Sequence, residues 1–129
     1  MTARTVILMV EDQAGVRALA RRILEPAGYL VIEAANGFDA ITLVDGGLHV
    51  DLLMADLDMP VLRGDEMVRR LRAADADLKV LYVTAHIDSL MEERPVLWQG
   101  EAFLEKPYTP AGLLEAVSLL MFGTIDRGV

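Results

Sequence analysis

Short apolar runs alternate with amphipathic segments along the whole chain. The runs cover residues 6–10, 29–32, 50–55, 80–83 and 102–104. They are apolar throughout except at Asp51, and their length and near-continuity predict buried β-strands. Between them, apolar residues recur at the spacing of one helix face, which predicts helices at 14–25, 38–44, 65–74 and 89–98, the last of them interrupted by Pro95. A final helix is expected to begin after Thr109, with Pro110 at its first position, and to end near Gly123.

Continuous apolar strands that alternate with amphipathic helices predict an α/β fold, a parallel sheet covered by helices on both faces. A length of 129 residues suits one domain. We expect a single domain over 1–129, with its core at about 5–122, a short tail at 123–129 and no output domain. In open sheets of this kind ligands bind beyond the carboxyl ends of the strands, so the residues there are the candidates for function.

Composition narrows the class of partner. The net charge of −8 disfavours direct binding to a phosphate backbone, so no nucleic-acid partner is expected. Cysteine is absent, which excludes disulfides, thiolate metal sites and a cysteine nucleophile. The longest apolar runs fall far short of the roughly 20 residues that span a bilayer, so we expect no membrane segment and a cytoplasmic protein.

Polar residues stand at the ends of four of the five expected strands. Glu11 and Asp12 follow the first strand, Asp56 the third, Thr84 the fourth, and Lys106 the fifth. Carboxylates that gather at one edge of a sheet repel one another, and a hard divalent cation such as Mg²⁺ or Mn²⁺ is the natural counterion for oxygen ligands. A metal ion, an ammonium group and a hydroxyl around one carboxylate are the equipment for phosphoryl transfer.

These residues stand in motifs that resemble those of response-regulator receiver domains of two-component and phosphorelay signalling. The motifs, in chain order, are Val10-Glu11-Asp12, Met54-Ala55-Asp56-Leu57-Asp58-Met59-Pro60 with Gly64, Val83-Thr84-Ala85, and Leu104-Glu105-Lys106-Pro107. The resemblance covers roughly residues 5–122. It implies a flavodoxin-like (βα)5 doubly wound sheet with strand order 2-1-3-4-5, the order of the chemotaxis receivers in this family.

The resemblance also implies a role for each matching residue. Asp56 would be the phosphoacceptor, and Lys106 would contact the phosphoryl oxygens. The Mg²⁺ ligands would be Asp12, Asp56 and the backbone carbonyl of Asp58, with Glu11 acting through a metal-bound water. The family's switch residues would be Thr84, whose hydroxyl moves onto the phosphoryl group, and the aromatic Phe103, which turns inward; Pro107 would follow a cis peptide bond.

Two positions depart from the usual family pattern. Position 58 is often neutral in the family, whereas Asp58 adds a fourth acid here. Position 86 is His86. The resemblance places both beside the phosphoryl group, where they would tune its rate of hydrolysis.

The implied function is a signalling switch and not a conventional enzyme. The phosphoryl donor would be the phosphohistidine of a sensor histidine kinase or of a phosphotransfer protein. A downstream protein would bind the face formed by the fourth helix, fifth strand and fifth helix, and a homodimer is possible in this family. The chain would act alone or as the receiver of a hybrid histidine kinase.

The residues also admit other functions. Asp56-Leu57-Asp58 after an apolar strand resembles the nucleophile motif of haloacid-dehalogenase-type phosphatases, although that family places the motif on its first strand. A degenerate receiver that only binds proteins is a further alternative. Taken singly, the strand-end residues could be ordinary helix caps and turn residues. The arginines of the third helix, Arg69, Arg70 and Arg72, are expected to form a solvated face.

Overall fold

The computed structural model describes residues 4–59, 61–88 and 100–123. The strands are β1 (Val6–Val10), β2 (Leu30–Ala34), β3 (Leu52–Asp56), β4 (Lys79–Thr84) and β5 (Glu101–Glu105). The helices are α1 (Ala14–Leu24), followed by the short 3₁₀ turn η1 (Glu25–Ala27), then α2 (Gly37–Asp45), α3 (Gly64–Arg72) and α5 (Pro110–Phe122). The helix expected at 89–98 lies outside the described residues.

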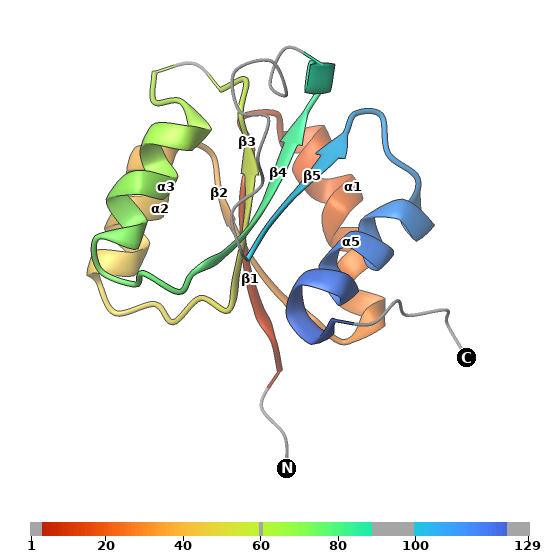
Figure 1. Cartoon of the computed structure of the whole chain (residues 1–129), viewed down its shortest axis with the longest axis horizontal. Coiled ribbons are helices and arrows are strands. Elements are labelled where there is room, and N and C mark those ends of the chain that lie inside the picture. Colours follow the sequence, from red (N-terminus) through yellow and green to blue (C-terminus); the bar gives the residue numbers. More distant parts are fainter. Residues whose placement is uncertain (1–3, 60, 89–99, 124–129) are drawn as a thin grey trace.

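All five strands are parallel and lie in the order β2-β1-β3-β4-β5. Helices α2 and α3 lie on one face of the sheet and α1 and α5 on the other, as Figure 1 shows. The α/β, flavodoxin-like fold with strand order 2-1-3-4-5 is therefore confirmed. Because the strands are parallel, their carboxyl ends all meet at the same edge of the sheet, toward the top of Figure 1.

Strand β3 is central and buried along its whole length. Its apolar side chains alternate between two cores, one against α2 and α3 and the other against α1 and α5. Leu53 and Ala55 belong to the first core, and Leu52 and Met54 to the second. Burial of each large aliphatic side chain contributes about 1.5 to 3 kcal/mol to the free energy of folding. Because such side chains enter both cores, packing on both faces fixes the strand that carries Asp56.

The helix boundaries agree closely with the apolar pattern. The Oγ1 atom of Thr109 accepts a hydrogen bond from the N–H of Gly112 (3.0 Å), Pro110 is the first residue of α5, and Gly123 ends the helix with φ 71°. The apolar spacing is wrong at one position of α1: it predicts that Leu19 faces the core, but Leu19 is 53% exposed. Around the helix axis, its position lies about 100° from Ala20 and about 140° from Leu24, the two buried residues of the helix.

No helix in the described ranges has the length and apolar character needed to cross a membrane.

Candidate functional site

Backbone pairing places the strand-end residues side by side. The N–H of Glu11 donates to the carbonyl of Ala34 (3.1 Å), and the N–H of Lys106 donates to the carbonyl of Thr84 (2.9 Å). Between them, Asp56 pairs with Val83 at the end of the β3–β4 register. The sheet order therefore brings together residues that are up to 95 positions apart in the chain.

Three carboxylates meet at this edge. Oxygen atoms of Glu11, Asp12 and Asp56 all lie within 4.8 Å of one another. Glu11 and Asp56 are buried, each only 4% exposed, whereas Asp12 is open to solvent. The Nζ atom of Lys106 lies 2.9 Å from Oε2 of Glu11 and 3.0 Å from Oδ2 of Asp56, so one ammonium group bridges the two buried acids.

One cation does not fully neutralise this cluster. Burial, together with a hydrogen bond and repulsion from Asp56, raises the pKa of Glu11 from 4.5 to about 7, although Lys106 opposes the change. Burial alone would lower the pKa of Lys106, but its hydrogen bonds to Glu11 and Asp56 outweigh burial and raise it. The cluster therefore holds a proton near neutral pH and is short of positive charge.

Local contacts fix the loops that carry these side chains. The guanidinium of Arg17 donates to the backbone carbonyl of Glu11 (2.7 Å) and to Glu33 (3.1 Å), which ties the loop after β1 to α1 and β2. On the other side, the N–H of Asp58 donates to Oδ1 of Asp56 (2.9 Å). With Lys106 on Oδ2, both oxygens of the Asp56 carboxylate accept a hydrogen bond, so its orientation is set.

Gly64 explains why the third helix can start so close to Asp56. A Cβ atom at position 64 would lie 2.6 Å from the backbone carbonyl oxygen of Asp56. No side chain fits at that distance, so glycine lets α3 approach the backbone of the phosphoacceptor candidate.

Thr84 and Asp58 are joined on the α3 side of this cluster. The buried hydroxyl of Thr84 donates to Oδ2 of Asp58 (3.1 Å) and accepts a hydrogen bond from the N–H of His86 (3.0 Å). The N–H of Ala85 lies 3.4 Å from the same Asp58 oxygen. The side chains of Asp58 and His86 are exposed at this edge of the sheet, where the sequence motifs predict them.

The two remaining candidates lie on β5 and just after it. Phe103 is half-buried, and its ring stacks on that of Tyr82, with centroids 5.2 Å apart and planes 19° apart. The peptide bond between Lys106 and Pro107 is cis, the conformation that the resemblance implies.

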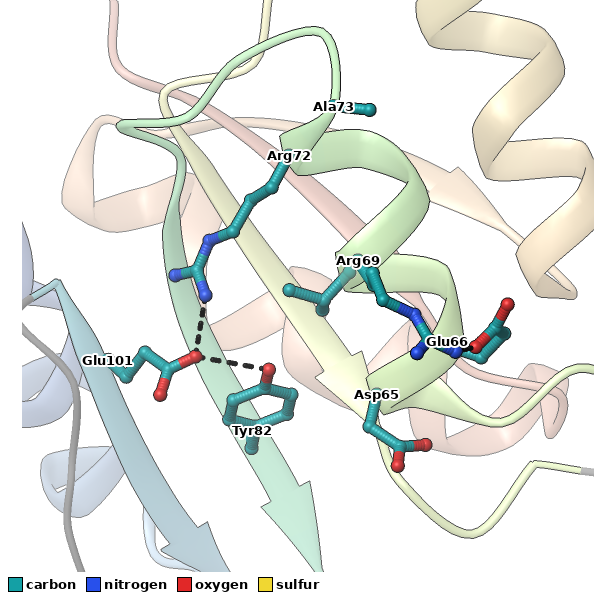
Figure 2. A pocket seen from close by; sticks show the side chains of 8 residues that line it. Asp65, Glu66, Arg69, Arg72, Ala73, Tyr82 and Glu101 are labelled. Carbon is teal, nitrogen blue, oxygen red and sulfur yellow. Dashed lines mark hydrogen bonds and ion pairs between the residues drawn. The ribbon is translucent and has the colours of Figure 1, made fainter.

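A second polar cluster, which the sequence pattern does not reveal, lies on α3, β4 and β5 (Figure 2). Its centre is Glu101, whose side chain is fully buried and whose Oε2 atom accepts hydrogen bonds from Arg72 (2.7 Å) and Tyr82 (3.2 Å). Arg72 also donates to the carbonyl of Leu78 (3.0 Å). Arg72, Tyr82 and Glu101 line a pocket of about 490 Å³ that none of the acid-cluster residues borders.

The expectation that Arg72 belongs to a solvated face is therefore wrong. Its side chain is only 16% exposed, because it extends from α3 to the buried carboxylate of Glu101 on β5. Arg69 and Arg70 are exposed and pair with Glu66 on their own helix. The signal that could have revealed the pair is an acid at the start of a strand: β5 begins at Glu101, one residue earlier than its apolar run.

The residues present fit a hard divalent cation. The donors are all oxygens, from Glu11, Asp12 and Asp56, and the described residues bring no sulfur or imidazole ligand into the cluster. Oxygen-only sets select Mg²⁺ or Mn²⁺ over softer metals. The raised pKa of Glu11, caused mainly by its burial and then by Asp56, is consistent with a cluster that a bound cation would stabilise.

Comparison with known proteins gives the same picture. A model of the family described as the response regulator receiver domain matches residues 7–118. Sensor kinase CckA of Brucella abortus (strain 2308) is 29% identical over 122 residues, which make up 94% of this chain but 13% of CckA. Sporulation initiation phosphotransferase F of Bacillus subtilis (strain 168) is 32% identical over 90 residues, 68% of this chain and 72% of that protein.

Solved structures agree with the sequence comparison. Chemotaxis protein CheY4 of Vibrio cholerae superposes with a TM-score of 0.81 at 27% identity, covering 92% of this chain and 99% of CheY4. Response regulator TrrA of Thermotoga maritima, solved in complex with Mg(2+)-BeF, superposes with a TM-score of 0.75 at 29% identity, covering 90% and 98%. With the family match over most of its length and the same sheet order, the chain belongs to the response regulator receiver domains of two-component systems.

Proposed function

We propose that this receiver accepts a phosphoryl group on Asp56 from the phosphohistidine of a sensor histidine kinase or a phosphotransfer protein. The observation that carries the proposal is the setting of the Asp56 carboxylate. It lies at the end of the central strand, 4% exposed, held by Lys106 on one oxygen and by the N–H of Asp58 on the other. Such a carboxylate is oriented before any donor arrives, which favours in-line attack.

In the proposed step a carboxylate oxygen of Asp56 attacks the phosphorus atom. A phosphorus–oxygen bond forms as the phosphorus–nitrogen bond breaks, and the electron pair of that bond returns to the donor imidazole. The ammonium group of Lys106 stabilises charge on the phosphoryl oxygens, because it already lies 3.0 Å from Asp56.

Glu11, Asp12, Asp56 and the backbone carbonyl of Asp58 are the proposed holders of Mg²⁺ or Mn²⁺, with Glu11 acting through water. When bound, such a cation neutralises charge that develops on the phosphoryl oxygens. Glu11, whose raised pKa retains a proton near neutral pH, would release that proton when a cation binds.

Phosphorylation would then change the partner-binding surface. Thr84 turns its hydroxyl to the new phosphoryl group, and Phe103 repacks as part of a shift between two conformations. In the proposed output face, β5 and α5 belong to the described residues, and Leu119 and Phe122 on α5 are exposed apolar side chains that a partner could cover. The rest of that face, at 89–98, lies outside them.

The receiver works either alone or within a longer protein. The chain spans 13% of CckA and about half of the MprA response regulators that it matches, but most of sporulation phosphotransferase F. The share of each relative that the chain covers therefore differs widely. We propose that residues 1–129 form a single receiver domain whose output lies in another molecule or in another part of a longer protein.

Incubation with acetyl phosphate and Mg²⁺, followed by intact-mass spectrometry, tests the proposed function. We expect one base-labile phosphoryl group per chain, lost in Asp56→Asn and dependent on the metal. The matched control is Asp51→Asn, which changes an acid at the opposite end of β3 and should retain labelling. Labelling that persists in Asp56→Asn would contradict the proposal.

The same assay separates a receiver from a haloacid-dehalogenase-type phosphatase. A receiver accumulates at most one phosphoryl group and turns over only through its own slow hydrolysis. Release of many phosphate molecules per chain, without accumulation of the acyl phosphate, would support the phosphatase instead.

A further inference from the structure

The hydroxyl of Thr84 is already engaged in this structure. Thr84 is 2% exposed, and its hydroxyl donates its proton to Oδ2 of Asp58 at 3.1 Å. The N–H of His86 donates to the same hydroxyl oxygen at 3.0 Å, so the oxygen faces a donor on one side and an acceptor on the other. A hydroxyl has one proton, and Thr84 cannot donate it to Asp58 and to a second acceptor together.

We propose that the Asp58 carboxylate is a latch that holds Thr84 in the resting position and competes with the phosphorylated Asp56 for the Thr84 hydroxyl. The inference rests on the proposed phosphorylation of Asp56 and adds a specific restraint to it. Asp58 is a positioning residue here, because it acts through Thr84.

The chemistry of the acceptor makes the latch effective. A hydrogen bond to an ionised carboxylate is roughly twice as strong as one between neutral groups. The carboxylate is placed by its own backbone, whose N–H donates to Asp56 at 2.9 Å, and the N–H of Ala85 lies 3.4 Å from its Oδ2 atom. Because Asp58 is exposed, solvent screens part of this interaction, and we expect the latch to weaken ligand binding at Asp56 by about threefold to tenfold.

A simpler effect must be separated from the latch. The negative charge of Asp58 would also repel a phosphoryl group directly, and that repulsion does not depend on the hydroxyl of Thr84. The latch, in contrast, disappears when the hydroxyl is removed. The two therefore differ in whether the effects of changing Asp58 and Thr84 are coupled.

A double-mutant cycle on beryllofluoride affinity makes this distinction. Beryllofluoride with Mg²⁺ is a non-covalent mimic of the phosphoryl group, and its dissociation constant is measured by titration of backbone amide signals in NMR. The proteins are wild type, Asp58→Ala, Thr84→Val and the double variant. Valine keeps the shape of Thr84 in its buried position, and substitution of the Asp58 side chain leaves the backbone carbonyl in place.

We expect Asp58→Ala to tighten binding by at least about threefold more in the Thr84 protein than in the Thr84→Val protein. Asp58→Asn is the matched control. Its side-chain oxygen still accepts a hydrogen bond from Thr84 but carries no charge, so this variant should keep part of the coupling between positions 58 and 84 that Asp58→Ala loses. Thermal melts of all variants establish that each is folded.

Equal tightening in both backgrounds would overturn the latch and leave charge repulsion alone. Unchanged or weaker binding in Asp58→Ala would overturn it as well. Failure of every protein to bind beryllofluoride, together with absence of phosphoryl labelling on Asp56, would overturn the proposed function and the latch with it, and is therefore distinct from failure of the latch alone.

Discussion

Replacing Glu11 by glutamine should remove the part of the pH dependence of stability that Glu11 causes in the metal-free protein. The pKa of Glu11 is about 7 in the folded state against an ordinary value of 4.5. Between these values the unfolded chain has lost the proton that the folded chain still binds, so unfolding releases a proton and the free energy of unfolding falls as pH rises. A gap of about 2.5 pH units corresponds to about 3 kcal/mol.

Glutamine keeps the shape of the protonated acid and cannot ionise. The stability of Glu11→Gln relative to wild type should therefore increase by about 2 to 3 kcal/mol between pH 5 and pH 8. Urea unfolding followed by circular dichroism in the presence of EDTA measures this difference at each pH. Added Mg²⁺ should stabilise wild type more at pH 8 than at pH 5, because a proton and a cation compete for the same carboxylates.

Glu105→Gln is the matched control, since it removes an exposed acid at the end of β5. Its stability relative to wild type should stay within about 0.5 kcal/mol over the same range. If Glu11→Gln follows wild type in parallel from pH 5 to pH 8, burial and repulsion by Asp56 do not act on Glu11 as the structure indicates, and the reasoning fails.

Three further changes probe the scaffold of the site. Gly64→Ala should lower the free energy of unfolding by about 1 to 3 kcal/mol in urea melts, because its Cβ atom would lie 2.6 Å from a backbone oxygen, while Gly15→Ala, with open space around it, should be neutral or slightly stabilising. Lys106→Arg should reduce the rate of labelling by acetyl phosphate more than about tenfold, because a planar guanidinium cannot replace a compact ammonium between two acids; equal loss in Lys79→Arg would refute this explanation. Arg72→Met should destabilise the fold by about 3 kcal/mol in the same urea assay, since it removes a guanidinium from a fully buried carboxylate, and a change below about 0.5 kcal/mol would show that the pair contributes little.

The apolar pattern is sufficient for the fold wherever each strand or helix carries its own signal. The run at 52–55, before Asp56, is apolar on both faces, which is typical of a strand covered on both sides, and β3 is such a strand. The last helix carries its cap at Thr109 and its terminator at Gly123, and both are as expected. Boundaries differ by a residue or two where polar residues continue an element, as at Glu101.

The candidate site is predictable to the extent that it depends on strand ends. Asp56 and Thr84 end their strands, and Asp12 and Lys106 follow theirs. A parallel sheet must bring these four positions to one edge. The direction in which each side chain points is not predictable in the same way. The hydrogen bond from Thr84 to Asp58 depends on the rotamers of both residues and on the register between β3 and β4.

By itself, the sequence determined the alternation of strands and helices, the two apolar cores and the set of polar groups at the carboxyl edge, because these depend on residue type and local spacing. Only the tertiary structure decided which groups pair. Lys106 meets Glu11 across 95 positions, Arg72 meets Glu101 across 29, and Thr84 meets Asp58 across 26. Sheet order and register bring these groups together in space. The same arrangement causes the burial that raises the pKa of Glu11 and the contact that holds the hydroxyl of Thr84.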